Sequence, residues 1–250
     1  MNCSNKISSP YVKKLSFEFG ADLCGVASAD RFEHAPEGFH PRDVLPGCQS
    51  IIVLGCRFLK STLYAKSSIP YTDVRNELSR KMDRMAIQLS YQLEEKKVLA
   101  VPINSIGPTE WDKRTDKSRG IISLKHAAEL AGLGRIGKNT LLINDNYGNM
   151  IWLSAVLVSE KLEPDPLAEY EGCLSTCTIC LESCPIQALD GVSMNQKTCW
   201  EYAFGYHKGG EWRIKCFTCR QVCPHCLGIN KDLKEGGGSG DRRPKRALPK

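Results

Sequence analysis

A cysteine-rich segment near the C-terminal end most constrains what this 250-residue chain can fold into. Nine of the 13 cysteines lie between residues 173 and 226, and most of them form two runs that end in Cys-Pro. The first run is Cys-x3-Cys-x2-Cys-x3-Cys-Pro, from Cys173 to Pro185, and the second is Cys-x2-Cys-x3-Cys-Pro, from Cys216 to Pro224. Iron–sulfur ferredoxins use similar runs, in which three close cysteines bind one cluster and the cysteine before proline binds the other. The spacing therefore predicts two [4Fe–4S] clusters with interleaved ligands.

Each cubane needs one thiolate for each of its irons, so the segment holds one cysteine more than two clusters require. The predicted ligands of cluster 1 are Cys173, Cys177, Cys180 and Cys223. The predicted ligands of cluster 2 are Cys184, Cys199, Cys216 and Cys219. Cys226 is left over, as an alternative to Cys199 or Cys173. A pair of structural zinc sites is the competing interpretation, although zinc ribbons rarely end a cysteine run in Cys-Pro. Each proline is expected in the first turn of a following helix, where its missing N–H costs nothing.

The N-terminus has no apolar stretch of the kind that a signal peptide carries, and no apolar run is long enough to span a bilayer. We therefore expect a cytoplasmic protein without membrane contact. In that compartment, crowded cysteines favour metal binding over disulfides. Cys24, Cys48 and Cys56 lie in apolar, strand-like surroundings and are expected to be core residues.

The net charge of +6 is concentrated in the last ten residues, which contribute +4 of it. These residues follow the glycine-rich stretch EGGGSG, so residues 233–250 are interpreted as a flexible basic tail. The charge that remains is too small to indicate a strongly polyanionic partner. Contact with nucleic acid is expected only through the tail.

Upstream of the cysteines, residues 1–165 alternate helical and strand-like patterns, which predicts an α/β (or α+β) domain built on a mixed sheet. Helices are expected at 9–20, 73–97 and 123–131, and strands at 22–28, 50–59, 98–103 and 148–159. The expected apolar face of the longest helix consists of Val74, Leu78, Met82, Met85, Leu89 and Leu93. Residues 166–232 are predicted to form a ferredoxin-like module with the two clusters.

The stretch AGLGRIGKNTLL, residues 131–142, contains two nucleotide-binding patterns, G-x-G-x-x-G and G-x-x-x-x-G-K. Both patterns need a strand before the glycines and a helix after them. Here the order is reversed, because a helical pattern precedes the glycines and strand-like residues follow them. We therefore interpret Gly132 and Gly134 as the end of a helix.

That stretch and the apolar segment after it, followed by CTICLESCPIQAL and CRQVCP, resemble epoxyqueuosine reductase and its relatives. The segment LPGCQSIIVLGCRF, nearer the N-terminus, is similar to that family as well. The resemblance implies a nitroreductase-like domain that binds cobalamin, with flavin as the alternative cofactor, and clusters that reduce the cobalt. It also implies that the glycine–lysine turn forms a wall of the corrinoid pocket, through Gly134, Gly137, Lys138, Asn139 and Thr140.

The sequence departs from that family in two places that bear on function. Where family members carry an acidic residue ahead of the glycines, this chain has Ser118, and Asp116 nearby is the candidate catalytic residue. Tyr147 and His126 are further candidate proton donors. The helical repeats that grip tRNA in the family have no counterpart after residue 232, which favours a shorter branch of the superfamily.

The expected function is that of an iron–sulfur oxidoreductase, corrinoid-dependent, which reduces a small molecule or a modified nucleoside. Electrons from flavodoxin, ferredoxin or a reductase would pass through the clusters to the cofactor of the N-terminal domain. The alternatives are an electron-transfer protein and a corrinoid-handling protein, neither with substrate chemistry of its own.

Overall fold

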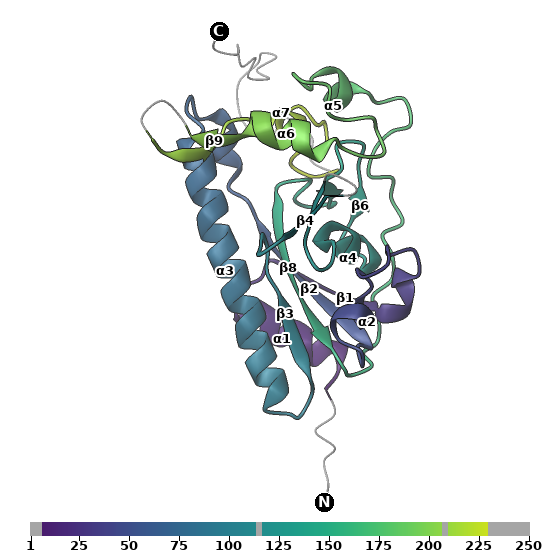
Figure 1. The fold of residues 1–250 in the computed structure, drawn as a ribbon. Coiled ribbons are helices and arrows are strands. Elements are labelled where there is room, and N and C mark those ends of the chain that lie inside the picture. Colours follow the sequence, from purple (N-terminus) through teal and green to yellow (C-terminus); the bar gives the residue numbers. More distant parts are fainter. Residues whose placement is uncertain (1–6, 114–116, 207–209, 230–250) are drawn as a thin grey trace, which may run out of the picture.

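The computed structural model describes residues 7–113, 117–206 and 210–229, and a four-stranded sheet lies at the centre of the fold (Figure 1). In spatial order its strands are β1 (Leu23–Ser28), β2 (Ser50–Arg57), β8 (Ile151–Val158) and β3 (Ala100–Ile103). Every neighbouring pair of strands in this sheet is antiparallel. The predicted α/β class is confirmed, but the predicted mixed sheet is wrong.

The difference arises because β8 lies between β2 and β3. These two strands flank the long helix α3 (Ile69–Glu94) in sequence and run in the same direction, as in a β-α-β unit. Leu157 of β8 faces Ile51 of β2 on one side and Val101 of β3 on the other. A strand from late in the chain thus separates the parallel pair, and no local sequence pattern encodes that insertion.

Strand β2 is buried on both faces, which explains its uninterrupted apolar sequence. On one face Ile52 and Leu54 share a core with α1 (Ser9–Glu18) and α3. On the other face Ile51 and Val53 share a core with α4 (Leu124–Leu130). Figure 1 shows α3 along one side of the sheet and α4 on the other. The predicted apolar face of α3 is confirmed, with these members fully or partly buried: Val74, Leu78, Met82, Met85, Leu89 and Leu93.

Shorter elements complete the two parts of the chain. Around the sheet they are η1 (Ala29–Phe32), α2 (Pro41–Val44), η2 (Lys60–Tyr64) and the paired strands β4 (Glu110–Asp112) and β5 (Lys117–Arg119). In the cysteine-rich part they are α5 (Ile179–Glu182), α6 (Gln196–Ala203), β9 (Phe204–Tyr206), β10 (Trp212–Ile214) and α7 (Thr218–Gln221). The cysteine-rich elements gather across one end of the sheet, near the start of α3 (Figure 1).

The first glycine of the stretch at 131–142, Gly132, ends helix α4 as the sequence predicts, whereas Gly134 packs against Ile143 instead. The amide of Leu133 donates to the carbonyl of Ala128 and the amide of Gly132 to that of Glu129, which is the Schellman pattern. Gly132 has a φ of +73°. The chain then forms a small hairpin of β6 (Arg135–Ile136) and β7 (Leu142–Ile143), so neither nucleotide pattern has a helix after it.

The cysteines outside the cysteine-rich segment that the structure describes are core residues. Cys24, Cys48 and Cys56 are all buried, in agreement with the prediction. Among the described residues, no helix has both the length and the apolar character needed to cross a membrane.

Candidate functional site: the cysteine loops and the turn beneath them

The thiols of the cysteine-rich segment fall into two groups of electrostatic neighbours. In the first group, burial raises the pKa of Cys180, and negative charge on Cys173 and Cys177 raises it further. Burial also raises the pKa of Cys223 to about 12, with contributions from Cys226, Cys173 and Cys180. Cys223 belongs to the second cysteine run, so the fold has brought it to the thiols of the first.

The second group is built in the same crossed manner. Burial raises the pKa of Cys199 to about 11, and negative charge on Cys216 and Cys184 adds to the shift. The pKa of Cys219 is raised to about 12, chiefly by burial, and Cys216, Cys199 and Cys184 again contribute. Cys184 comes from the first run and lies among thiols of the second. The second group has the same members as the predicted ligand set of cluster 2, and the first contains those of cluster 1 together with Cys226. The binding of clusters to them stays a prediction.

The local backbone explains how the thiols are presented. Cys180 lies in the one-turn helix α5 and Cys219 in the one-turn helix α7, and these two helices are neighbours. The amide of Ala188 donates to the sulfur of Cys184 at 3.3 Å, which holds that thiol against the turn. The expectation that Pro185 and Pro224 begin helices is wrong, because each lies in a turn. The amide of Gln187 closes the first turn on the carbonyl of Cys184.

Within the described ranges, no group of three or more His, Cys, Asp or Glu side chains is arranged to hold a single metal ion. Sulfur ligands of one zinc ion sit at the corners of a tetrahedron, about 3.8 Å apart for Zn–S bonds of 2.3 Å. A cubane separates its thiolates further, because each binds a different iron. Metal analysis of the purified protein therefore distinguishes zinc from a cluster at these thiols.

Cys226, the cysteine that the assignment leaves over, lies in an apolar cluster. It packs among Phe58, Tyr71, Met150 and Phe217, and it is buried. The predicted ligand Cys223 packs against the same cluster, so the exclusion of Cys226 from both ligand sets stays a prediction.

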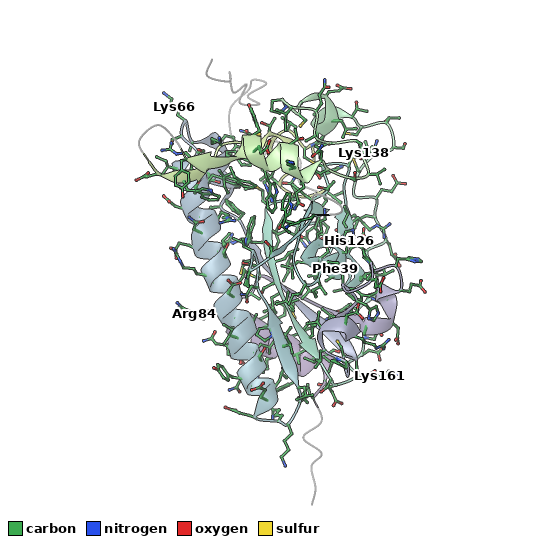
Figure 2. All side chains as sticks on the ribbon, viewed as in Figure 1. Phe39, Lys66, Arg84, His126, Lys138 and Lys161 are labelled. Carbon is green, nitrogen blue, oxygen red and sulfur yellow. The ribbon has the colours of Figure 1, made fainter. Side chains whose placement is uncertain are left out.

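The glycine–lysine turn lies directly against the cysteine loops. The ammonium of Lys138 donates to the carbonyls of Ser175 at 2.6 Å and Cys177 at 2.9 Å. The side-chain amide of Asn139 donates to the carbonyl of Cys219 at 3.1 Å. Figure 2 shows Lys138 at the end of the molecule that carries the cysteine-rich elements. Two adjacent side chains thus hold one loop of each cysteine run.

The other predicted corrinoid contacts also engage the chain itself. The carbonyl of Thr140 accepts a hydrogen bond from Lys125 at 3.0 Å. A Cβ on Gly134 would lie 2.4 Å from the carbonyl oxygen of Ile143, and a Cβ on Gly137 would lie 2.6 Å from that residue's side chain. The glycines therefore permit close packing within the hairpin. Contact between this turn and a corrinoid stays a prediction.

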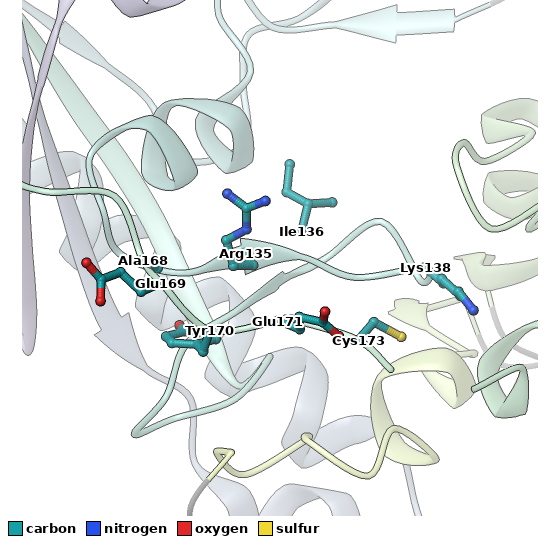
Figure 3. A pocket seen from close by; sticks show the side chains of 9 residues that line it. Arg135, Ile136, Lys138, Ala168, Glu169, Tyr170, Glu171 and Cys173 are labelled. Atoms are coloured by element: carbon teal, nitrogen blue, oxygen red, sulfur yellow. The ribbon is translucent and has the colours of Figure 1, made fainter. Parts of the chain in front are cut away.

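A groove of about 450 Å³ borders the first cysteine loop (Figure 3). Lys138 and Cys173 lie at the same end of it. Arg135, which pairs with Glu129 at 3.7 Å, also lines it. The hydroxyl of Tyr170 donates to the carbonyl of Ile143 at 2.9 Å. The groove is mixed in charge and contains no cation free of partners among these residues.

The candidate proton donors that the structure describes each have a partner within the chain. Asp116 lies outside the described residues. The hydroxyl of Ser118 donates to the hydroxyl of Thr109 at 2.9 Å, and the backbone amide of Ser118 donates to the side chain of Gln196. His126 lies 2.7 Å from the hydroxyl of Ser123 at the start of α4, and Tyr147 has a partner of its own.

One residue that sequence reasoning missed is Arg220, between Cys219 and Cys223. It is buried, and Asn149 donates to its carbonyl at 3.2 Å. In the sequence, the signal is an arginine that stands between two predicted cluster ligands. In the structure, its burial is notable because arginine is almost never fully buried unless it is paired.

Comparison with known proteins finds relatives that are named epoxyqueuosine reductase. The epoxyqueuosine reductase of Staphylococcus aureus is 29% identical over 262 residues, covering 87% of this chain and 64% of that protein. That of Gloeobacter violaceus is 29% identical over 228 residues, covering 81% of this chain and 64% of that protein. The chain thus spans slightly less than two thirds of the length of these relatives. No family model matches the chain.

Solved structures show the same fold. Epoxyqueuosine reductase from Streptococcus thermophilus aligns with a TM-score of 0.60 at 21% identity, over 89% of this chain and 67% of that chain. An epoxyqueuosine reductase solved with an epoxyqueuosine-modified tRNA-Tyr stem loop aligns with a TM-score of 0.58 at 21% identity. The alignment covers 87% of this chain and 64% of that chain. A reductive dehalogenase, whose structure suggests a mechanism for B12-dependent dehalogenation, aligns with a TM-score of 0.64 at 17% identity. The alignment covers 90% of this chain and 33% of that chain. Over most of its length, the chain is therefore a homologue of proteins named epoxyqueuosine reductase and shares the fold of their solved structures.

Proposed function

We propose that this chain is a cobalamin-linked iron–sulfur reductase. In this proposal, two [4Fe–4S] clusters pass electrons to a cofactor in the N-terminal domain, which reduces a modified nucleoside or a small molecule. The observation that carries it is the crossing of the cysteine runs: Cys223 joins the first thiol group and Cys184 joins the second. That crossing is the ligand pattern of two-cluster ferredoxins. Each cluster supplies one-electron redox chemistry when it is bound.

The thiols present in each group fit a cubane in number and in type. Cys173, Cys177, Cys180 and Cys223 would hold the first cluster. Cys184, Cys199, Cys216 and Cys219 would hold the second. Lys138 and Asn139 contribute by fixing the backbone of one loop in each group, which keeps the thiols in place before and after electron transfer.

Cobalamin is proposed on the strength of the relatives and the fold. The named relatives are epoxyqueuosine reductases, and a B12-dependent dehalogenase shares the fold. The turn from Gly134 to Thr140 does not support this part, because its polar groups and glycines already contact the chain itself. We therefore assign no residue of that turn to a step at the cobalt.

A nucleoside within RNA is the proposed substrate class. It is supported by the relative that was solved with a modified tRNA stem loop. The basic tail predicted from sequence lies outside the described residues, so its part in RNA contact stays a prediction. The electron donor, proposed as flavodoxin, ferredoxin or a reductase, is to be identified by reconstitution.

The decisive experiment is purification without oxygen, followed by iron, sulfide and metal analysis and an optical and EPR spectrum. We expect a brown protein with about eight irons per chain, from two cubane clusters. Cys177→Ala and Cys219→Ala should each remove about half of the iron, whereas the matched control Cys226→Ala should keep it. A colourless protein that contains zinc and no iron would refute the proposal.

Titration with cobalamin tests the second part. A shifted cobalt spectrum at one equivalent, with reduction of the cobalt by the reduced clusters, is the expected result. Clusters without cobalamin binding would instead support the alternative of an electron-transfer protein without substrate chemistry. That alternative is favoured by Ser118, which stands where relatives carry an acid and whose hydroxyl is engaged by Thr109. Turnover of RNA that contains epoxyqueuosine separates a reductase from a corrinoid-handling protein.

A further inference from the structure

We propose that Arg220 is a positioning residue that raises the reduction potential of the second cluster, the one assigned to Cys184, Cys199, Cys216 and Cys219. The inference rests on the proposed function, since it requires that these thiols bind a cluster. Nothing in the similarity to known proteins assigns a role to this arginine.

Arg220 is a buried cation without an acidic partner. The residue is 7% exposed, and its Nη1 is buried without a hydrogen-bond partner. None of the ion pairs in the described part of the chain includes it. An unpaired guanidinium in a protein interior is costly, so buried charges are paired in stable folds. A buried guanidinium of this kind is stabilised by a neighbouring anion.

The surroundings identify where that anion belongs. Arg220 directly follows Cys219, a predicted ligand of the second cluster, in the one-turn helix α7. Its other electrostatic neighbours, Tyr71 and Cys226, lie in the apolar cluster and belong to neither predicted ligand set. Among the predicted ligands, Cys219 of the second group is therefore the neighbour of Arg220.

The position of Arg220 is fixed from the N-terminal domain. Asn149 donates from its side-chain amide to the carbonyl of Arg220 at 3.2 Å, and Asn139 holds the adjacent carbonyl of Cys219 at 3.1 Å. The Oδ1 of Asn149 is also buried without a partner. The two bonds therefore fix the backbone from which the guanidinium extends.

The physical consequence follows from charge. Four thiolates outweigh the positive charge of the oxidised core, so the cluster is an anion that can neutralise Arg220. Reduction takes one electron from a one-electron donor and adds a further negative charge to the cluster. A nearby buried cation stabilises the reduced form more than the oxidised form, and the low dielectric of the interior strengthens the effect. Net charge is one of the factors that set cluster potentials.

The test is an EPR-monitored redox titration of the anaerobically purified full chain, with dithionite as the electron donor. In Arg220→Gln the second cluster should become about tenfold harder to reduce, which corresponds to about 59 mV for one electron. Arg220→Lys retains the charge and should keep most of the wild-type potential. Arg75→Gln is the matched control, since Arg75 is half-buried between Trp152 and Trp212 and should leave the potential unchanged.

Cys219→Ala assigns the EPR signal of the second cluster, so that the shift can be ascribed to one site. If Arg220→Gln does not fold, Arg220→Met removes the same charge while keeping an aliphatic side chain, and it serves in its place. An unchanged potential in the uncharged variant, or an equal shift in Arg220→Lys, would overturn the inference while leaving the clusters in place. Absence of iron from the wild-type protein would overturn the proposed function itself.

Discussion

At the residue scale, the contacts between the turn and the cysteine loops are made by side chains that donate to carbonyl groups. Lys138 serves the first loop, and Asn139 and Asn149 serve the second. These donors engage carbonyl oxygens, so they hold the loops without using the sulfurs. The lysine is visible in the sequence, but its partners are distant in the chain and only the fold reveals them.

Lys138→Met should weaken the first cluster and leave the second almost unaffected. The substitution removes two charge-assisted hydrogen bonds to the loop that carries Cys177, and such bonds are among the stronger ones in proteins. Iron release to a chelator, followed by EPR, should show several-fold faster loss of the first cluster's signal. Lys161→Met, at an exposed lysine on the opposite end of the molecule, is the control (Figure 2). Equal rates of loss from both clusters would contradict this assignment.

Cys24 provides a pH-dependent test of the core. Burial raises the pKa of its thiol to about 11, from 9.0 for an unperturbed thiol. Between these values the unfolded thiol loses its proton while the folded one keeps it, so folding stability falls as the pH rises. The free energy of unfolding should therefore drop by about 1 kcal/mol more in the wild type than in Cys24→Ala between pH 8 and pH 10. Urea unfolding at the two pH values measures the difference, and identical drops would place the thiol outside the core.

At the scale of elements, the glycine that ends α4 also allows the segment around Pro166 to approach the end of that helix. Gly132 has a φ of +73°, and a Cβ there would lie 2.0 Å from the carbonyl oxygen of Pro166. Asp165, next to it, accepts from the amide of Val26 at 2.8 Å and pairs with Lys13. The end of the helix and the start of the cysteine-rich part are therefore held at one point on the N-terminal domain.

Gly132→Ala should cost about 2–4 kcal/mol of stability, because it combines backbone strain with a steric clash in a packed region. Gly38→Ala is the matched control: its φ is +81°, yet a Cβ there would have no atom within 4 Å, so it should cost only about 1 kcal/mol. Urea unfolding of both variants gives the comparison. Equal losses would show that the approach of Pro166 contributes nothing.

The elements also mark where sequence reasoning succeeds and where it fails. Strand β2 and helix α3 follow from local patterns, because an apolar run and a 3.6-residue period reflect burial directly. The pairing of β8 between β2 and β3 does not, since pairing depends on contacts between residues far apart in the chain. The Cys-Pro pattern also could not predict that Pro185 and Pro224 lie in turns. Proline constrains φ to the same range in a turn and in the first turn of a helix. The two predicted ligand sets also rest on local spacing, which has a known chemical cause, and they stay a prediction.

At the scale of the whole molecule, the cysteine-rich part and the N-terminal domain share one apolar cluster. Phe217 stacks on Tyr71 with ring centroids 4.0 Å apart, and Tyr71 stacks on Phe58 at 4.6 Å. Hydrogen bonds reinforce the contact: Gln221 donates to the carbonyl of Leu63 at 2.8 Å, and the amide of Ile214 donates to the hydroxyl of Thr72 at 3.1 Å. Packing of this kind couples the stability of the two parts.

Removal of the clusters should therefore destabilise the chain as one unit. Metal binding to the folded state alone adds its binding free energy to folding, and loss of the metal withdraws it. Differential scanning calorimetry should show one transition in the loaded protein and one transition at lower temperature after anaerobic chelation. Phe217→Ala, which cuts the shared cluster but leaves every predicted ligand in place, should uncouple the parts and split the transition in two. A chelated wild-type protein whose main transition keeps its temperature would show instead that the N-terminal domain folds without support from the cysteine-rich part.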